Sequence, residues 1–216
     1  MPELAEKCIS SWKTHSPDYE IIEINETNFD VHSHPYTSYF YKKKKYAFVS
    51  DYVRLKTIFD NGGVYMDIDV EMFKNFDSLL KYDAFFGFEF KTAVASGLGF
   101  GAVKGNNLLS EMISEYDNMK PNINGEYKQV ICTKINTDVL VHHGLETNGK
   151  TQYLENGTVA VFSSDYLNPL FWDGVLYKTE NTYAKHWFNG SWITFSDKLR
   201  LKLSKYFHKI KNIFFK

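Results

Sequence analysis

The clearest periodic pattern lies between Ala47 and Asp60, where large apolar side chains recur at intervals of four, three and four residues. These side chains share one face of a predicted helix, since three or four residues make one helical turn. They are Phe48, Tyr52, Leu55 and Phe59. The Asn-Gly-Gly sequence of residues 61–63 should end this helix, and a strand is predicted directly after it, over Val64 to Val70.

The other apolar runs predict an alternation of helices and strands. Helices are expected over residues 2–16, 36–45 and 106–119, and strands over residues 19–24, 83–90, 98–103 and 158–162. Strands that alternate with helices favour an α/β fold. The chain has neither an internal repeat nor a Pro- or Gly-rich linker before residue 197, which favours a single domain over residues 1–197.

Composition indicates a globular protein and distinguishes residues 198–216, the tail, from the rest of the chain. The chain has 216 residues, 44% of them hydrophobic, so it can bury a substantial core. Its formal net charge is −1, which excludes nucleic-acid binding driven by overall charge. Residues 198–216 contain six lysines, one arginine and no acid. They predict a basic amphipathic helix that either lies on an anionic membrane or docks on the domain.

The termini and cysteines bear on location. The start of the chain lacks the basic head and apolar stretch of a secretion signal, and no run of 18 apolar residues exists. Cys8 and Cys132 lie far apart and match neither a zinc site nor a disulfide framework. We therefore expect buried thiols in a cytoplasmic protein, and the basic tail favours a peripheral position at the inner face of the membrane.

An Asp-Ile-Asp triplet supplies the first candidate chemistry. Asp67 and Asp69 fall within the apolar strand predicted over Val64 to Val70, where charges must be paired or bind a metal. Alternation along a strand points both carboxylates to the same side, near its carboxyl end. Mn²⁺ or Mg²⁺ suits such a site, with substrate phosphates completing its coordination, so the implied substrate is a nucleotide diphosphate.

The preceding helix offers a second group. Ser50, Asp51 and Arg54 project from one side of it, beside the apolar face, and should be partly buried. An aspartate with an arginine fork can hold sugar hydroxyls. The alternative is an ordinary Asp-Arg pair on a helix surface.

Together these motifs resemble a known family. The sequence contains Ser50-Asp51-Tyr52-x-Arg54, then Gly62-Gly63-Val64-Tyr65-x-Asp67-x-Asp69, and finally His186-Trp187-x-x-Gly190-Ser191-Trp192. This order resembles the DXD-containing glycosyltransferases that include capsular-polysaccharide enzymes and yeast-type α-mannosyltransferases. It is similar, more distantly, to the glucosyltransferase domain of large clostridial toxins.

The resemblance implies a GT-A-type fold, with a mixed central sheet flanked by helices, and a metal-dependent, retaining transfer from a sugar nucleotide. Asp69 would bind the metal, with Asp67 and His186 as further candidate ligands. Asp67 would also face the sugar and ribose of the donor, and Asp51 and Arg54 would hold the transferred sugar. The remaining implied donor-site residues are Ser50, Tyr65, Ser191 and Trp192. For His186 the alternative is an ordinary histidine in an aromatic loop.

The chain also departs from the family. Relatives begin with an additional strand ending in Trp-x-Gly, which forms part of the nucleotide-binding sheet and is absent here. We therefore expect an incomplete N-terminus; a misassigned start, or a protein that binds its donor weakly, are the alternatives.

The expected reaction moves a hexose from a UDP-sugar to a surface or capsular glycan, or to a lipid-linked glycan. Since the motifs supply no spare carboxylate as nucleophile, we expect front-face attack, with the departing phosphate taking the acceptor's proton. Two other functions remain open. One is a toxin-like transfer to a protein hydroxyl, and the other is an inactive sugar-nucleotide binding module.

Overall fold

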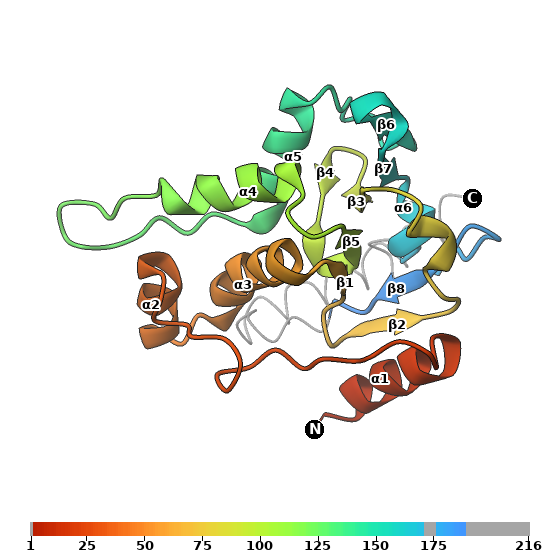
Figure 1. Cartoon of the computed structure of the whole chain (residues 1–216), viewed down its shortest axis with the longest axis horizontal. Coiled ribbons are helices and arrows are strands. Elements are labelled where there is room, and N and C mark those ends of the chain that lie inside the picture. Colours follow the sequence, from red (N-terminus) through yellow and green to blue (C-terminus); the bar gives the residue numbers. More distant parts are fainter. Residues whose placement is uncertain (1, 171–175, 189–216) are drawn as a thin grey trace, which may run out of the picture.

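A six-stranded mixed sheet forms the centre of the computed structural model, which describes residues 2–170 and 176–188 (Figure 1). Within that part of the chain, only β3 and β7 pair in parallel, and every other pair is antiparallel. The strand order is β1 (Gly63–Tyr65), β5 (Phe100–Ala102), β3 (Ala84–Phe90), β7 (Val159–Phe162) and β6 (Gln152–Leu154), with β4 (Ala93–Val94) paired to β3. The predicted α/β architecture with a mixed central sheet flanked by helices is confirmed.

Both faces of this sheet are covered, so its central strands are apolar on both sides. One face packs against helices α2 to α5 and buries Phe86, Phe88 and Phe100 with them. The other face, which includes Phe85 and Phe162, packs against α1, α6 and a second, two-stranded sheet. These elements are α1 (Glu3–His15), α2 (Pro35–Lys42), α3 (Tyr46–Asn61), α4 (Asn107–Asp117), α5 (Cys132–His142), α6 (Ser164–Leu167), β2 (Val70–Met72) and β8 (Ala184–His186).

The predicted helices are confirmed within a few residues. The segments over 2–16, 36–45, 47–60 and 106–119 correspond to α1, α2, α3 and α4. Local signals fix their ends. Asn106 caps α4, because its side-chain oxygen accepts hydrogen bonds from the N–H groups of Leu108 and Leu109. Gly62 follows α3 with a φ of 74°, a left-handed conformation that favours glycine.

The strand predicted over Val64 to Val70 is wrong in a way that matters for the site. The strand β1 stops at Tyr65, and the chain turns before entering β2 at Val70. The Val70 N–H donates to the Asp67 carbonyl at 2.9 Å, which closes this turn. The apolar run over Val64 to Val70 therefore contributes to strands of two different sheets. The aspartates lie between these strands rather than inside a buried strand.

Two other predicted strands need correction. Residues 19–24 form no strand in the described chain, because no backbone there pairs with the segment, and Ile22 remains 63% exposed. The strand expected over residues 98–103 begins only at Phe100, after a short 3-10 turn over Ser96–Leu98. Similar 3-10 turns occupy Asp77–Leu79 and Glu155–Gly157.

Candidate functional site

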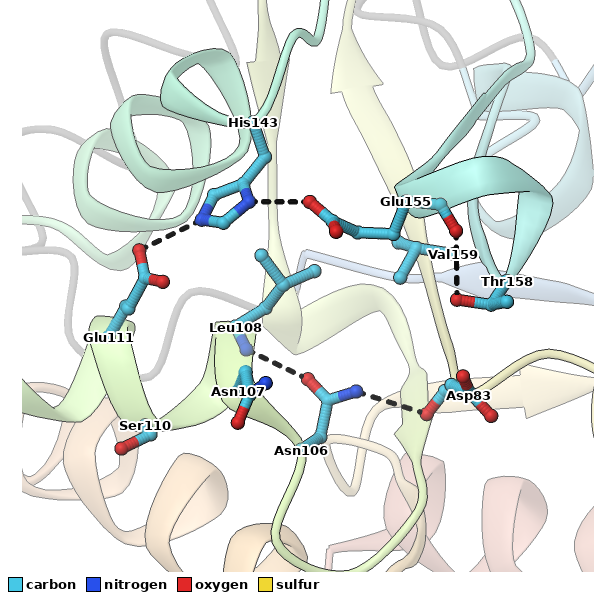
Figure 2. Close-up of a pocket in the computed structure, with 10 residues that line it drawn as sticks. All are labelled: Asp83, Asn106, Asn107, Leu108, Ser110, Glu111, His143, Glu155, Thr158 and Val159. Carbon is cyan, nitrogen blue, oxygen red and sulfur yellow. Dashed lines mark hydrogen bonds and ion pairs between the residues drawn. The ribbon is translucent and has the colours of Figure 1, made fainter.

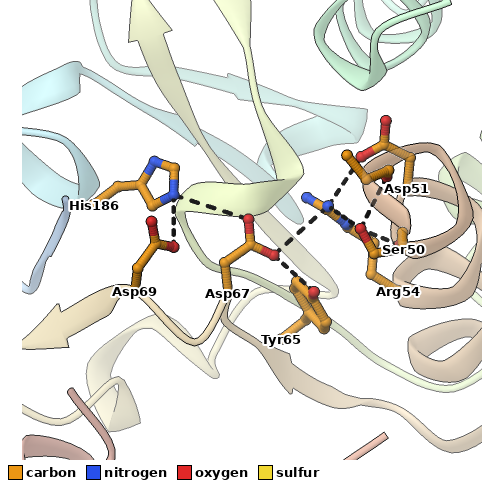
Figure 3. Close-up of polar contacts among 8 residues, drawn as sticks. Ser50, Asp51, Arg54, Tyr65, Asp67, Asp69 and His186 are labelled. Atoms are coloured by element: carbon orange, nitrogen blue, oxygen red, sulfur yellow. Dashed lines mark hydrogen bonds and ion pairs between the residues drawn. The ribbon is translucent and has the colours of Figure 1, made fainter. Parts of the chain in front are cut away.

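The turn between β1 and β2 brings the two aspartates to a histidine from the far end of the chain. His186 ends β8 and lies in register with Val70 on β2, so its ring reaches the turn. Its Nε2 atom lies 3.0 Å from Asp69 Oδ1 and 3.9 Å from Asp67 Oδ2. One donor atom from each of the three side chains lies within 4.8 Å of the other two (Figure 3).

Neighbouring elements hold this turn from both sides. The Trp187 N–H donates to the Asp69 carbonyl at 3.0 Å, and the indole N–H of Trp12 donates to the Val70 carbonyl at 2.7 Å. Trp12 belongs to α1, which packs on β2. The position of Asp67 and Asp69 is therefore set by α1 and β8, not by the local sequence alone.

Arg54 on α3 links the aspartate turn to the helix. Its Nη2 atom lies 2.9 Å from Asp51 Oδ1 and 3.6 Å from Asp67 Oδ1. The guanidinium also donates to the carbonyl and hydroxyl oxygens of Ser50, both at 3.1 Å. Tyr65 completes the group, since its hydroxyl donates to Asp67 Oδ1 at 2.7 Å (Figure 3). One oxygen of Asp67 thus faces Arg54 and Tyr65, while the other faces His186.

Burial dominates the electrostatics of this network. It raises the pKa of Asp51 to about 6, although the nearby Arg54 charge opposes the change. Burial disfavours the charge of Arg54 as well, but Asp67, Tyr65 and Asp51 outweigh it and raise its pKa above the ordinary value. Burial and the charge of Asp67 raise the pKa of Tyr65. Arg54 therefore stays charged between two carboxylates, where its removal would leave both without a counter-charge.

The start of α5 contributes a contact that sequence analysis did not anticipate. Cys132 is the first residue of α5, and the proximity of its thiol and backbone N–H lowers the pKa of Asp51, opposing the effect of burial. Burial raises the pKa of this thiol, which therefore stays protonated, as expected of an inert buried cysteine. A helix N-terminus stabilises a carboxylate, so α5 helps to fix Asp51 in place.

Gly97 gives the charged groups their space. A Cβ atom at this residue would lie 2.6 Å from Asp67 Oδ2 and 2.9 Å from Arg54 Nη1. Any larger residue would push these two side chains out of position.

A comparison with known protein families gives one match for this chain. Residues 2–86 match the family described as the glycosyltransferase sugar-binding region containing a DXD motif. The match covers less than half of the chain. No curated protein matches the chain. The matched region includes α1, α3, the Asp67–Asp69 turn and the first three residues of β3. The family supports a nucleotide-sugar glycosyltransferase, and the mixed sheet is consistent with a GT-A-like domain.

The cluster of Asp67, Asp69 and His186 fits a hard divalent cation. Two carboxylate oxygens and one imidazole nitrogen converge, and a metal such as Mn²⁺ or Mg²⁺ would find its remaining ligands in water and phosphate oxygens. Asp67 can bind a cation and keep its other contacts, because Tyr65 and Arg54 both contact its Oδ1 while Oδ2 faces His186.

Most of the predicted site residues therefore lie close together, although their individual roles remain predictions. The structure gathers seven of the predicted side chains into one network, which runs from α3 to β8. They are Ser50, Asp51, Arg54, Tyr65, Asp67, Asp69 and His186. Ser191 and Trp192 lie outside the described residues. No sequence motif marked Cys132 or Gly97, since their importance comes only from what folds against them.

A separate cavity of about 360 Å³ lies at the opposite end of the sheet (Figure 2). Asp83 and Val159 line it where β3 and β7 begin, whereas Asp67 and Asp69 follow the carboxyl end of β1, which runs in the same direction as β3. In its wall, His143 lies between Glu111 and Glu155, with contacts of 2.9 and 2.6 Å. This cavity is distinct from the candidate donor site.

Proposed function

We propose that the protein is a metal-dependent, retaining glycosyltransferase that moves a hexose from a UDP-sugar to a glycan acceptor. The observation that supports this most is the proximity of two kinds of site. A three-residue cation site lies directly beside a buried Asp-Arg pair, and Asp67 takes part in both. A sugar diphosphate needs both, since its phosphates require a cation and its hydroxyls require oriented donors and acceptors.

In the proposed reaction, Asp67, Asp69 and His186 would hold Mn²⁺ or Mg²⁺, whose contribution is to neutralise the negative charge that develops on the leaving diphosphate. Asp51 and Arg54 would orient the transferred sugar, with Ser50 fixing the guanidinium. Tyr65 would line the donor pocket. Each of these side chains is held by at least one hydrogen bond or ion pair, so the site is organised before the donor binds.

For the transfer itself, we propose front-face attack by the acceptor hydroxyl. The bond from the anomeric carbon to the phosphate oxygen breaks while the new glycosidic bond forms on the same face. The departing phosphate takes the acceptor's proton. A sugar trapped covalently on any side chain would contradict this route.

The proposed acceptor is a surface, capsular or lipid-linked glycan, reached by a peripheral protein at the inner face of the membrane. The basic tail over residues 198–216 supports this proposal through its charge alone. In the described part of the chain, no helix is both long enough and apolar enough to cross a membrane.

Release of diphosphate from a panel of UDP-sugars with Mn²⁺ tests the proposal. Wild-type protein should hydrolyse one of these donors slowly, whereas Asp69→Asn should reduce the rate by at least about 100-fold, because a cation ligand is lost. Asp60→Asn is a matched control, since Asp60 pairs with Lys56 on the exposed side of α3. A fully active Asp69→Asn variant would remove the proposed cation site.

The same assay separates the two alternatives. A binding module would be stabilised thermally by UDP and Mn²⁺ but would release no diphosphate. A toxin-like enzyme would transfer the labelled sugar to protein in a cell extract and not to glycan.

A further inference from the structure

The buried 3-10 turn over Ser96–Leu98 adjoins the charged part of the candidate site. Gly97 is its middle residue, and a Cβ atom there would lie 2.6 Å from Asp67 Oδ2 and 2.9 Å from Arg54 Nη1. The Gly97 carbonyl also accepts a hydrogen bond from the Asp67 N–H at 3.4 Å. The position of this turn therefore determines the space that Asp67 and Arg54 share.

Helix α5 holds the turn through the side chain of Asn136. Ser96 presents a backbone N–H, which can only donate, and Cys132 presents a carbonyl, which can only accept, so the amide of Asn136 can satisfy both in one orientation. Its oxygen then accepts from the N–H and the hydroxyl of Ser96, both at 3.0 Å. Its nitrogen donates to the Cys132 carbonyl at 3.3 Å.

These contacts are made without water. Asn136 and Ser96 are both completely buried. Removing the Asn136 amide would leave the Ser96 N–H and the Cys132 carbonyl without these hydrogen bonds, and a buried polar group that loses its partner is strongly unfavourable. The turn is therefore tied to the first turns of α5 by a contact that cannot be replaced easily.

The next residue of α5 holds the chain just before the turn. The Thr137 hydroxyl oxygen accepts the Val94 N–H at 2.9 Å, and Thr137 is also buried. Of these two neighbouring side chains, only Asn136 contacts the residue that adjoins Gly97. The two positions therefore allow an effect on the site to be distinguished from an effect on stability.

We propose that Asn136 is a positioning residue, which holds the Ser96–Leu98 turn so that Gly97 fixes the approach of Asp67 to Arg54. This inference rests on the proposed function, in which Asp67 would hold the cation and Arg54 the transferred sugar. It assigns a role to α5, which lies outside the matched residues 2–86.

Diphosphate release and melting temperature, measured on the same variants, test this role. Asn136→Ala should reduce donor hydrolysis by about 10- to 100-fold at a temperature where it remains folded, because a released turn lets Asp67 and Arg54 shift. Thr137→Val is the matched control, since it also removes a buried hydrogen-bond acceptor from α5. It should lower the melting temperature but hydrolyse the donor like wild type.

A double-mutant cycle with Gly97→Ala shows whether the effect passes through Gly97. While Asn136 holds the turn, the added methyl group must displace Asp67 or Arg54. Once Asn136→Ala has released the turn, the same methyl group should do less harm. The double variant should therefore keep at least about 10-fold more hydrolysis than the product of the two single losses predicts. If Asn136 contributed only to stability, the two losses would multiply.

The outcomes separate this inference from the function on which it rests. Wild-type hydrolysis in Asn136→Ala, an equal loss in Thr137→Val, or losses that multiply in the double variant would overturn the role of Asn136 and leave the donor site in place. If Asn136→Ala does not fold, Ser96→Ala decides the question, because it removes only the hydroxyl contact. Its loss of hydrolysis should be smaller and should also couple to Gly97→Ala, and an uncoupled result contradicts the inference. A wild-type protein that releases no diphosphate from any donor would overturn the proposed function, and this inference with it.

Discussion

Gly97 is the residue over which two charged side chains meet. It has no side chain, so Asp67 Oδ2 and Arg54 Nη1 can occupy the space where a Cβ atom would be. Neither group can move freely, because Asp67 also contacts Tyr65 and Arg54 also contacts Asp51. A methyl group at this position should therefore disturb the site more than it disturbs the fold.

We predict that Gly97→Ala folds but loses up to about 100-fold of donor hydrolysis, because a misplacement of about 1 Å can have that effect. Melting temperature and diphosphate release measure the two properties separately. Gly87→Ala is the matched control, since the three atoms nearest to its new methyl group all belong to Leu167, which is not a predicted site residue. If Gly97→Ala kept wild-type hydrolysis, the close approach of Asp67 and Arg54 would have no functional importance.

At the same scale, the sequence identified the side chains with recognisable motifs. Local spacing was enough to identify four of them, because they lie on one helix and one short segment. These are Asp51, Arg54, Asp67 and Asp69. The contact of His186 with Asp69 joins residues 117 positions apart, and only the resemblance to a family pointed to it. Gly97 could not be identified, because its importance depends on the side chains of Asp67 and Arg54 that fold against it.

Among the elements, helices were predicted more accurately than strands. The helix α3 follows from its own apolar periodicity, and α4 from its periodicity and its Asn106 cap. A strand depends on a partner that sequence does not show. Residues 19–24 have strand-like composition but no pairing partner in the described chain, and Val64 to Val70 divides between two sheets because β8 pairs with its second half.

His143 connects three elements on the side of the molecule away from the site. It follows α5 and contacts Glu111 on α4 and Glu155 in the 3-10 turn before β7, while the His142 ring lies edge-on beside it. The hydrogen bond to Glu111, reinforced by the one to Glu155, raises the pKa of His143, although burial opposes the change. Because the folded-state pKa exceeds the unfolded value, the stabilisation is complete below about pH 6.5 and is lost as the pH rises through the folded-state pKa.

We therefore predict that His143→Gln lowers the free energy of unfolding at pH 5.5 by roughly 0.5–1 kcal/mol, a small amount because both glutamates are about half exposed. At pH 8.5 the difference from wild type should shrink. Urea denaturation at the two pH values measures it. His142→Gln serves as the control, since its ring is exposed and makes neither ion pair. A pH-independent difference for His143→Gln would show that its contribution does not depend on its charge.

For the whole molecule, the two-sided core explains how distant segments form one site. Helices α3 and α5 bring Asp51 and Arg54 to one face of the sheet, while α1 and β8 hold the Asp67–Asp69 turn from the other. The site therefore depends on both halves of the core. In the described chain β1 pairs only with β5, so its other edge has no strand neighbour.

The distribution of charge also belongs to the whole chain. Residues 198–216 hold seven basic groups and no acid, whereas residues 1–197 hold 18 basic and 26 acidic groups. We predict that the full chain binds vesicles containing phosphatidylglycerol and not vesicles of phosphatidylcholine alone. Each lysine near an anionic surface contributes about 1 kcal/mol, and added salt should weaken the binding.

Replacing four tail lysines with glutamine should lower the affinity for the anionic vesicles by at least about 100-fold in a sedimentation assay. The four are Lys198, Lys202, Lys205 and Lys209. The same change at the exposed run of Lys42, Lys43, Lys44 and Lys45 removes an equal charge elsewhere, so it controls for overall charge. If both variants lost affinity equally, attraction would come from net charge and not from the tail. If wild type did not sediment at all, the alternative that the tail docks on the domain would be favoured.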